Sequence, residues 1–192
     1  PHTLKFADTQ KDISVILADL SHSNIQPDAS LSDKASPIYN PANGHYYQYI
    51  NDYVSWDTAN TIANSQSYNG QNGYLTTVTS ASEDSFIKNS VLPKTNWQGS
   101  AWIGASDASS EGNWFWVTGP EKGTQFWSGS ANGHSVNGQY TGWLSGEPNN
   151  LYGNENYGQY YYSGSGWNDS APTASGCGYV IEYGGLSDKA SP

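Results

Sequence analysis

Five oxygen-bearing side chains lie close together in the carboxyl-terminal third of the sequence, and none of them is basic. Glu147, Asn149 and Glu155 come first, and Asn168 and Asp169 follow a tyrosine-rich run. A hard cation such as calcium takes six to eight oxygen ligands in a flexible shell. Carboxylates and amides in this number would nearly neutralise the ion and leave positions open for ligands from outside the protein. The spacing therefore predicts an open calcium site.

The order of these residues resembles a known family. The primary calcium site of C-type lectin domains carries Glu-Pro-Asn, then a glutamate, then Trp-Asn-Asp. The matching positions are Glu147-Pro148-Asn149, Glu155 and Trp167-Asn168-Asp169, with Trp102-Ile103-Gly104 upstream and Tyr179-Val180-Ile181-Glu182-Tyr183 near the end. The resemblance extends over about residues 38–185. It implies an α+β fold of the C-type lectin type, in which two helices flank small antiparallel sheets and a long loop region binds calcium.

The resemblance also implies how the site holds a sugar. Glu147 with Asn149, and Glu155 with Asn168, would each grip one of two adjacent hydroxyls, the carboxylate accepting and the amide donating a hydrogen bond. Asp169 would complete the calcium shell, and the peptide bond before Pro148 is cis in the family. The Glu-Pro-Asn order is typical of domains for mannose, glucose, N-acetylglucosamine and fucose, whereas Gln-Pro-Asp would indicate galactose.

A second, auxiliary calcium site follows from the same resemblance. Four residues match the family positions that bind it: Asp107, Glu111, Asn150 and Asn156. In many relatives the last two positions are acidic, and here both are amides. Less negative charge predicts weaker binding of this ion.

Composition excludes several classes of partner. The 192 residues carry 17 acidic and 7 basic side chains, for a net charge of −10. Nucleic-acid binding draws on lysine and arginine at phosphates, so this balance argues against nucleic acid and against anionic membrane surfaces. No signal peptide, membrane-spanning run or lipidation motif is visible. Because the chain begins with Pro1 and contains no Met, we expect it to be a segment of a longer protein.

The single cysteine, Cys177, cannot form an internal disulfide. Animal C-type lectin domains usually carry two or more disulfides, so the sequence indicates a disulfide-free, bacterial type of the family. We expect Cys177 to be a small buried residue beside the last strand. The formylglycine-generating enzymes share a related fold but need active-site cysteine chemistry, so we expect no enzymatic activity here.

The chain divides into four parts. Residues 1–30 form an amino-terminal extension or the end of a preceding module, with residues 13–17 as a strand paired to 3–6, or a helix over 12–20. Residues 31–37 form a linker, 38–185 the lectin domain, and 186–192 repeat the linker letter for letter. The repeat predicts that a second copy of the domain begins after it. A linker reused between unrelated modules is the alternative.

Local patterns predict the elements that carry the site. We expect strands at 44–50, 74–78, 102–105, 113–117 and 179–183, a helix over 56–67 capped by Ser55, and a second helix that opens near 80–82. The Gly-, Ser- and Asn-rich residues 119–140 would form the long loop region that holds the calcium.

The function predicted is calcium-dependent carbohydrate binding by a non-catalytic module of a large surface adhesin, secreted or at the cell surface. Its partners would be cell-surface glycans or free sugars, together with neighbouring modules of the same chain, without membrane insertion. The alternative is a protein- or ice-binding module on the same fold that does not recognise sugar. Competition by free monosaccharide would separate the two.

Overall fold

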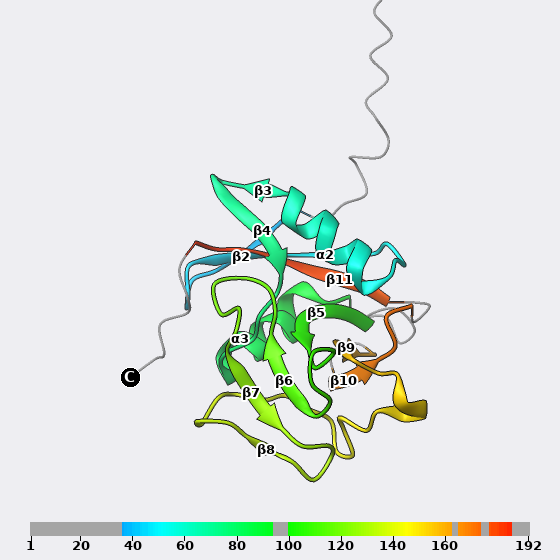
Figure 1. Ribbon diagram of the computed structural model, residues 1–192. Helices are drawn as coiled ribbons and strands as arrows, with labels where there is room; N and C mark the ends of the chain where they lie inside the picture. The colour runs from blue at the N-terminus through cyan, green and yellow to red at the C-terminus, as the bar shows by residue number, and fades with distance from the viewer. Residues whose placement is uncertain (1–35, 94–99, 163–164, 174–176, 186–192) are drawn as a thin grey trace, which may run out of the picture. The chain divides into compact units, whose positions relative to one another are not determined.

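The computed structural model describes residues 36–93, 100–162, 165–173 and 177–185 (Figure 1). The strand or helix expected in residues 1–30 lies outside this part. So does the repeated segment, apart from Ser36 and Pro37. The account below concerns the described residues alone.

The strands of the described residues join into one sheet (Figure 1). Its main path runs β1-β2-β11-β5-β6-β7-β8, with β4 paired to β11 and β3, and β9 paired to β5 and β10. Their bounds are β1 Ile38–Asn40, β2 His45–Ile50, β3 Ser67–Tyr68, β4 Gln71–Leu75, β5 Ser100–Ser106, β6 Asn113–Trp116, β7 Gln125–Ser128, β8 His134–Ser135, β9 Tyr157–Tyr161, β10 Gly166–Ser170 and β11 Cys177–Tyr183.

The sheet is mixed, where small antiparallel sheets were expected. Strand β11 lies between β2 and β5, antiparallel to β2 but parallel to β5. The last strand therefore closes the domain by inserting between elements that are far apart in the sequence. The other pairs of named strands in the described residues are antiparallel.

Two helices form where their capping residues predict them. Helix α2 covers Trp56–Ser65, and the Ser55 side chain accepts a hydrogen bond from the Thr58 amide. It ends two residues earlier than expected, because Ser67 already belongs to β3. Helix α3 covers Ala81–Phe86 behind the cap Ser80 and continues as the π-helical turn η1, Ile87–Val91.

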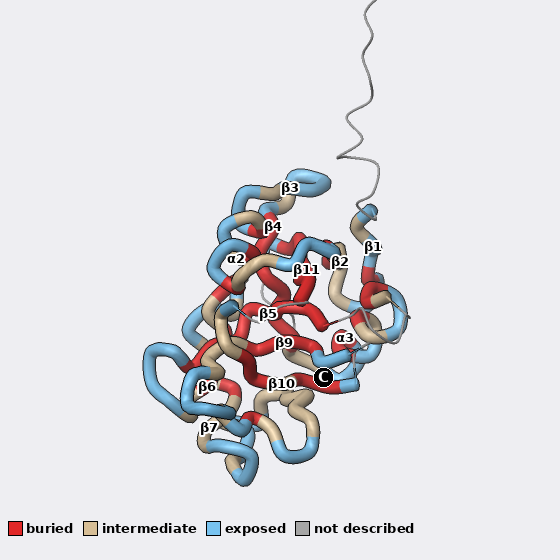
Figure 2. The backbone as a smooth tube through the Cα atoms, turned by 90° about the vertical axis from the view of Figure 1, so that its right-hand side faces the viewer, coloured by how far each residue is buried: buried red, intermediate tan, exposed pale blue. Residues whose placement is uncertain are grey.

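The core lies in two clusters. In one, α2 packs Trp56, Ala59 and Ala63 against β4, β5 and β11. The other joins α3 and η1 to β2, β5, β6, β7, β9 and β10 and is rich in aromatic side chains. Trp102, Trp114 and Trp116 are fully buried, so their sequence-based interpretation as core residues is confirmed. Figure 2 shows the buried backbone running through β5, β9 and β11 in the middle of the domain.

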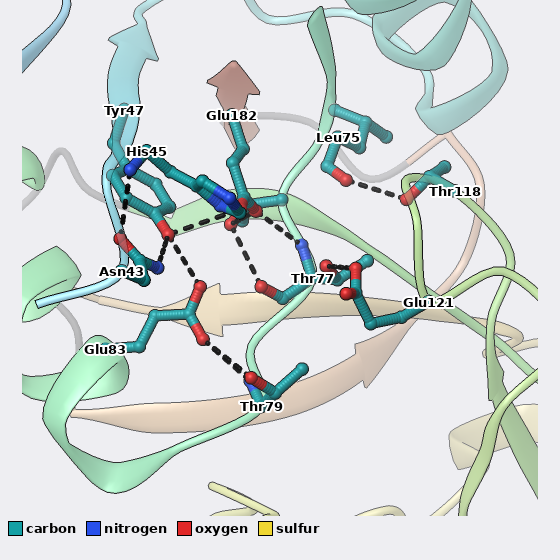
Figure 3. A network of polar contacts seen from close by, with 11 residues as sticks. Asn43, His45, Tyr47, Leu75, Thr77, Thr79, Glu83, Thr118, Glu121 and Glu182 are labelled. Atoms are coloured by element: carbon teal, nitrogen blue, oxygen red, sulfur yellow. Dashed lines mark hydrogen bonds and ion pairs between the residues drawn. The ribbon is translucent and has the colours of Figure 1, made fainter. Parts of the chain in front are cut away.

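A buried polar network ties β2, β11 and α3 together (Figure 3). The Tyr47 hydroxyl donates to Glu83 Oε1 at 2.7 Å and lies 3.2 Å from Glu182 Oε1. His45 Nδ1 contacts the same Glu182 oxygen at 2.6 Å, which forms an ion pair when the imidazole is protonated. The second Glu182 oxygen accepts from the Thr77 amide at 3.1 Å. Two carboxylates are thus fixed in the interior by donors from several elements.

Two sequence predictions about strands were wrong. Strand β4 ends at Leu75, three residues before the expected end, because the Thr77 amide bonds to the Glu182 side chain instead of to a neighbouring strand. Residues 119–140 are not one long loop, since they contain β7 and β8, which extend the sheet from β6. The predicted primary ligands lie further along the chain, in residues 147–155 and in β10.

Candidate functional site

The Glu147-Pro148-Asn149 segment is held against β10 by backbone pairing. The Trp167 amide donates to the Gly142 carbonyl at 2.8 Å, and the Leu144 amide donates to the Trp167 carbonyl at 2.9 Å. Residue 142 must be glycine, because a Cβ atom there would lie 2.8 Å from the Trp167 ring. The next turn brings the Glu147 amide to the Leu144 carbonyl at 3.0 Å. This pairing places Glu147 beside the two residues that follow Trp167.

Asp169 anchors the segment after Pro148. One of its carboxylate oxygens accepts from the Asn149 amide at 3.0 Å and the other from the Asn150 amide at 2.6 Å. Asp169 is itself fully buried in β10, while Asn168 beside it donates its side-chain amide to the Asp169 carbonyl. The Glu147-Pro148 peptide bond is cis, as the family resemblance implies. Four of the five predicted primary residues therefore meet at β10.

Glu155, the fifth, closes the loop that follows. Its Oε2 accepts from the Leu151 amide at 2.8 Å, and its own amide donates to Asn150 Oδ1 at 3.1 Å. The short helical turn η2, Leu151–Gly153, lies between Asn150 and Glu155. The side chains of predicted ligand residues thus accept hydrogen bonds from the backbone at both ends of residues 149–155.

The surroundings of Glu147 and Glu155 oppose the ionised state of these two carboxyls. The pKa of Glu147 is raised to about 7, chiefly by burial. The neighbouring Asp169 raises it further through contact and charge, and the charge of Glu155 adds to the effect. Burial is also the first cause that raises the pKa of Glu155, with the charge of Asp169 adding to it. Like charges this close favour the protonated form unless a cation joins them.

An unsatisfied oxygen marks the same place. Within the described residues, Glu147 Oε2 is buried and has no hydrogen-bond partner. Buried polar atoms are nearly always hydrogen-bonded, so such an oxygen calls for an explanation, of which an ion is one. The donor set, carboxylate and amide oxygens without a basic side chain, has the chemistry that calcium prefers. These residues therefore fit a calcium ion.

Two carboxylates of this group are bonded to the backbone of the loop. The part of the chain that the structure describes contains no cluster of three or more His, Cys, Asp or Glu side chains arranged to hold a metal ion. The reason is visible in the contacts above: Asp169 and Glu155 direct oxygens to backbone amides of the loop.

The predicted auxiliary residues lie next to this group. Asp107 is buried at the end of β5, where its Oδ2 accepts from the Gly112 amide at 2.8 Å; among the described residues its Oδ1 has no hydrogen-bond partner. Burial, offset in part by that Gly112 bond and increased by the charges of Glu111 and Asp169, raises the pKa of Asp107 to about 6. The Asp107 amide donates to the Asn156 carbonyl at 3.3 Å. The fourth residue, Asn150, bonds to Glu155 instead through its side chain.

Sequence reasoning missed two residues at this place. Leu151 and Tyr152, in the turn η2, are exposed large apolar side chains on the loop between predicted ligands. The sequence offers only a weak signal for them, an apolar pair within a polar Asn- and Gly-rich run.

Cys177 behaves as expected, but the tyrosine-rich run does not. Cys177 is a free, buried thiol that contacts Gln159 Oε1 at 3.0 Å, and burial raises its pKa well above the ordinary range. The tyrosines of the run do not alternate: in β9 Tyr160 is buried, whereas Tyr161 and the following Tyr162 are both exposed. No helix of the described residues has both the length and the apolar character needed to cross a membrane.

Relatives are found by sequence and by structure. Residues 53–177 match the Lectin C-type domain. The chain is 42% identical over 164 residues to halomucin of Haloquadratum walsbyi (strain DSM 16790 / HBSQ001), which covers 85% of this chain and 2% of halomucin. It is 33% identical over 127 residues to C-type lectin domain family 4 member M of Gorilla gorilla gorilla, which covers 66% of this chain and 27% of that protein. The chain therefore spans a small part of these relatives.

Solved structures agree with the sequence match. C-type lectin CEL-I from Cucumaria echinata superposes with a TM-score of 0.58 at 26% identity, covering 80% of this chain and 96% of CEL-I. The herring type II antifreeze protein superposes with a TM-score of 0.52 at 20% identity, covering 79% of this chain and 96% of the other, and so shares the fold alone. From the domain match, the relatives and the mixed sheet with its two helices, the chain belongs to the C-type lectin domain family.

Proposed function

We propose that this domain binds carbohydrate through a calcium ion and carries out no catalysis. The observation that carries the proposal is the buried Glu147 Oε2, which has no hydrogen-bond partner among the described residues and belongs to a carboxyl whose pKa is raised by burial and by the neighbouring Asp169 and Glu155. A divalent cation bound at Glu147 would give the buried oxygen a partner. Its positive charge would also stabilise the ionised carboxylates beside it.

Each predicted primary residue has a role in this proposal. Glu147, Asn149, Glu155, Asn168 and Asp169 would hold the ion. When bound, calcium supplies positive charge that attracts the oxygens of two adjacent sugar hydroxyls. The exposed position of Asn149 leaves its amide available to a ligand, and Glu147 and Asn168 are only half-buried. A carboxylate that accepts and an amide that donates can then hold one hydroxyl from two sides.

The order Glu147-Pro148-Asn149 supports a sugar class. It is the order expected for mannose, glucose, N-acetylglucosamine and fucose, and the proposal adopts these sugars. The auxiliary residues Asp107, Glu111, Asn150 and Asn156 would hold a second calcium ion. The buried, unpartnered Asp107 Oδ1 supports this part of the proposal.

The setting that we propose is a secreted or cell-surface adhesin. The size of one relative supports this setting: the segment similar to this chain makes up 2% of halomucin, so halomucin is a very large protein. Glycans on other cells, or free sugars, would be the ligands, and further modules of the same chain would lie on either side of the repeated linker.

A glycan array run in calcium and again in excess chelator tests the proposal. We expect mannose-type glycans to retain the protein in calcium, chelator to abolish retention, and free mannose to compete. The Glu147→Gln variant should lose retention, whereas Glu121→Gln, which changes a half-buried glutamate beside Thr77, should keep it. Retention in chelator, or binding only to protein or ice, would contradict the proposal and favour the alternative function.

A further inference from the structure

Tyrosine side chains from four strands meet on one face of the sheet. The ring centroids of Tyr39 in β1 and Tyr46 in β2 are 5.0 Å apart, and Tyr46 is 5.1 Å from Tyr68 in β3. Tyr68 in turn lies 5.7 Å from Tyr183 in β11. The four rings therefore form one continuous cluster, which we call the tyrosine patch.

The strand register explains why these side chains share a face. Tyr46 pairs directly with Tyr39 in β1 and with Tyr183 in β11. Residues that lie opposite each other in antiparallel strands point their side chains the same way. Tyr183 is buried, whereas Tyr39 is 50% and Tyr68 38% exposed. The outer rings of the patch therefore face solvent, and Figure 2 shows β3 and the start of β1 as exposed.

The segments that carry the exposed rings contain no charged side chain. Residues 38–50, which include β1 and β2, have no Asp, Glu, Lys or Arg, and neither do residues 58–82, which include β3 and β4. The whole chain, in contrast, has a net charge of −10. Two copies of so acidic a chain repel each other, so a contact between them costs least where neither carries a charge. Enrichment in tyrosine and depletion of charge are also typical of the core of a protein interface.

The repeated linker joins the domain beside this patch. Strand β1 begins at Ile38 and β11 ends at Tyr183, and both flank the first half of β2. These two points are about 10 Å apart, because neighbouring strands are spaced by about 4.8 Å. Residues 31–37 directly precede Ile38, and their copy, residues 186–192, follows Tyr183 after two glycines. The linker therefore enters and leaves the domain at the same place.

We propose that the tyrosine patch is the docking surface for a second copy of this domain, joined to the first through the repeated linker. A copy that follows residues 186–192 as residues 38–185 follow 31–37 begins at once with its own β1. Seven residues span at most about 25 Å, so the linker holds the two patches close together. The contact is self-complementary, with the rings of one copy packed on the rings of the other. It is independent of the proposed sugar binding.

This contact needs little intrinsic affinity. A short flexible linker gives the attached copy an effective concentration in the millimolar range. A contact that forms within one chain at that concentration also forms between separate chains at about 1 mM. Self-association of the 192-residue chain therefore tests the docking surface directly.

Sedimentation equilibrium measures this association, in chelator and without sugar, at protein concentrations from about 10 μM to 1 mM. We expect the average mass to rise towards that of a dimer, with a dissociation constant of about 0.1–1 mM. Raising the salt concentration from about 0.1 M to 1 M should tighten the dimer, because salt screens the repulsion between two acidic copies. A dimer that weakens in salt would contradict an uncharged contact.

Matched variants locate the contact. Tyr39→Asn and Tyr68→Asn should each weaken the dimer about five-fold or more, the loss typical of a central aromatic residue in an interface. Tyr68→Phe should keep most of the affinity, because the ring remains. Tyr53→Asn is the control and should change nothing: Tyr53 is 52% exposed, close to the value for Tyr39, and lies in the segment before α2, outside the patch. Melting temperatures show whether each variant is folded.

Amide NMR spectra across the same concentrations test the surface without any variant. We expect concentration-dependent shifts at Ile38, Tyr39 and residues 67–70. The inference is overturned if the chain stays monomeric at about 1 mM, if the shifts lie elsewhere, or if Tyr53→Asn weakens the dimer as much as Tyr39→Asn. A monomer in which Tyr39→Asn shifts amides of residues 1–30 would also overturn it and assign that segment to the patch. Because chelator is present throughout, none of these results bears on calcium-dependent sugar binding.

Discussion

The carboxylate of Asp169 receives the backbone amide of Asn150 at 2.6 Å, so a buried side chain of β10 holds the loop that carries the proposed ligands. The neighbouring amide of Asn149 binds the other oxygen at 3.0 Å. Asp169 therefore has two tasks: it shapes the loop in the protein alone, and it would ligate calcium. The proposed calcium site and its loop would be stabilised by the same atoms.

Asp169→Asn should loosen that loop. An amide keeps one acceptor oxygen but presents an NH₂ group to the second backbone N–H, so one charge-assisted bond is lost. A loss of about 1–3 kcal/mol corresponds to roughly 5- to 150-fold faster hydrogen exchange at the Asn149 and Asn150 amides, measured by NMR. Asp57→Asn, at an exposed position in the first turn of α2, is the matched control. Unchanged exchange at those two amides would show that Asp169 does not anchor the loop.

Calcium should raise the melting temperature of the domain. An ion that binds only the folded state stabilises it by about 2.7 kcal/mol at a hundred times its dissociation constant. For a domain of this size that amounts to an increase of about 5–10 °C, measured by scanning calorimetry in calcium and in chelator. Magnesium at the same concentration should do less, because it demands a tighter octahedral shell. Equal melting temperatures in calcium and chelator would contradict the site.

Without calcium, stability should fall as pH rises from about 5 to about 7. The folded-state pKa of Glu147 is raised to about 7, first by burial and then by Asp169 and Glu155, whereas an unfolded glutamate titrates at about 4.3. In that interval the folded state binds more protons than the unfolded state, so the contribution is full at low pH and is lost as pH rises through the folded pKa. Asp107, raised to about 6, acts in the same direction.

Chemical denaturation at pH 5 and pH 7.5, in chelator, measures this slope. Glu147→Gln should flatten it, because glutamine does not titrate. Calcium affinity should change in the opposite sense and increase with pH, since the ion binds deprotonated carboxyls. A slope that is the same in the variant would assign the pH dependence to other groups.

Exchanging two ligand types should change sugar preference. Glu147→Gln with Asn149→Asp keeps an oxygen at each position and swaps the acceptor and the donor around one hydroxyl. We expect the double variant to be displaced by galactose at lower concentration than by mannose, reversing the wild-type order by about ten-fold. Competition on an immobilised glycan measures both sugars, and a preference for mannose in the double variant would mean that other residues select the sugar.

Tyr47→Phe should destabilise the fold without touching the site. It removes the hydroxyl that donates to Glu83 and accepts from the Asn43 side chain at 2.7 Å. Loss of a donor to a buried carboxylate costs about 1–3 kcal/mol of unfolding free energy. Tyr49→Phe, two residues along β2, removes a hydroxyl whose bond to Asn51 is exposed, and should cost less than about 0.5 kcal/mol. Equal effects in denaturant titrations would rule out a special role for the buried network.

Sequence reasoning succeeded where a local pattern decides the structure. Ser55 and Ser80 cap helices because each side chain accepts a backbone amide three residues later. The aromatic and β-branched runs of β2 and β11 form strands for reasons equally local. The ordered motif from Glu147 to Asp169 predicted the family, and with it the cis bond before Pro148.

Sequence reasoning failed where a partner that is distant in the chain decides the structure. The strand expected at 74–78 ends early because Glu182, more than a hundred residues away, receives the Thr77 amide. Strand β7 went unnoticed because its polar residues reveal little alternation, and only Phe126 is fully buried.

The order β1-β2-β11 determines how the domain would carry tension. Both β1 and β11 run antiparallel to β2, through three and five residue pairs respectively, so the first and last strands point the same way. A pull on the two ends of the domain would shear these strands lengthwise, and their hydrogen bonds would resist together instead of opening one after another. The loop from Glu147 to Glu155 lies outside this mechanical path. In the adhesin that we propose, tension along the chain would therefore load these strands and leave the proposed sugar site undeformed.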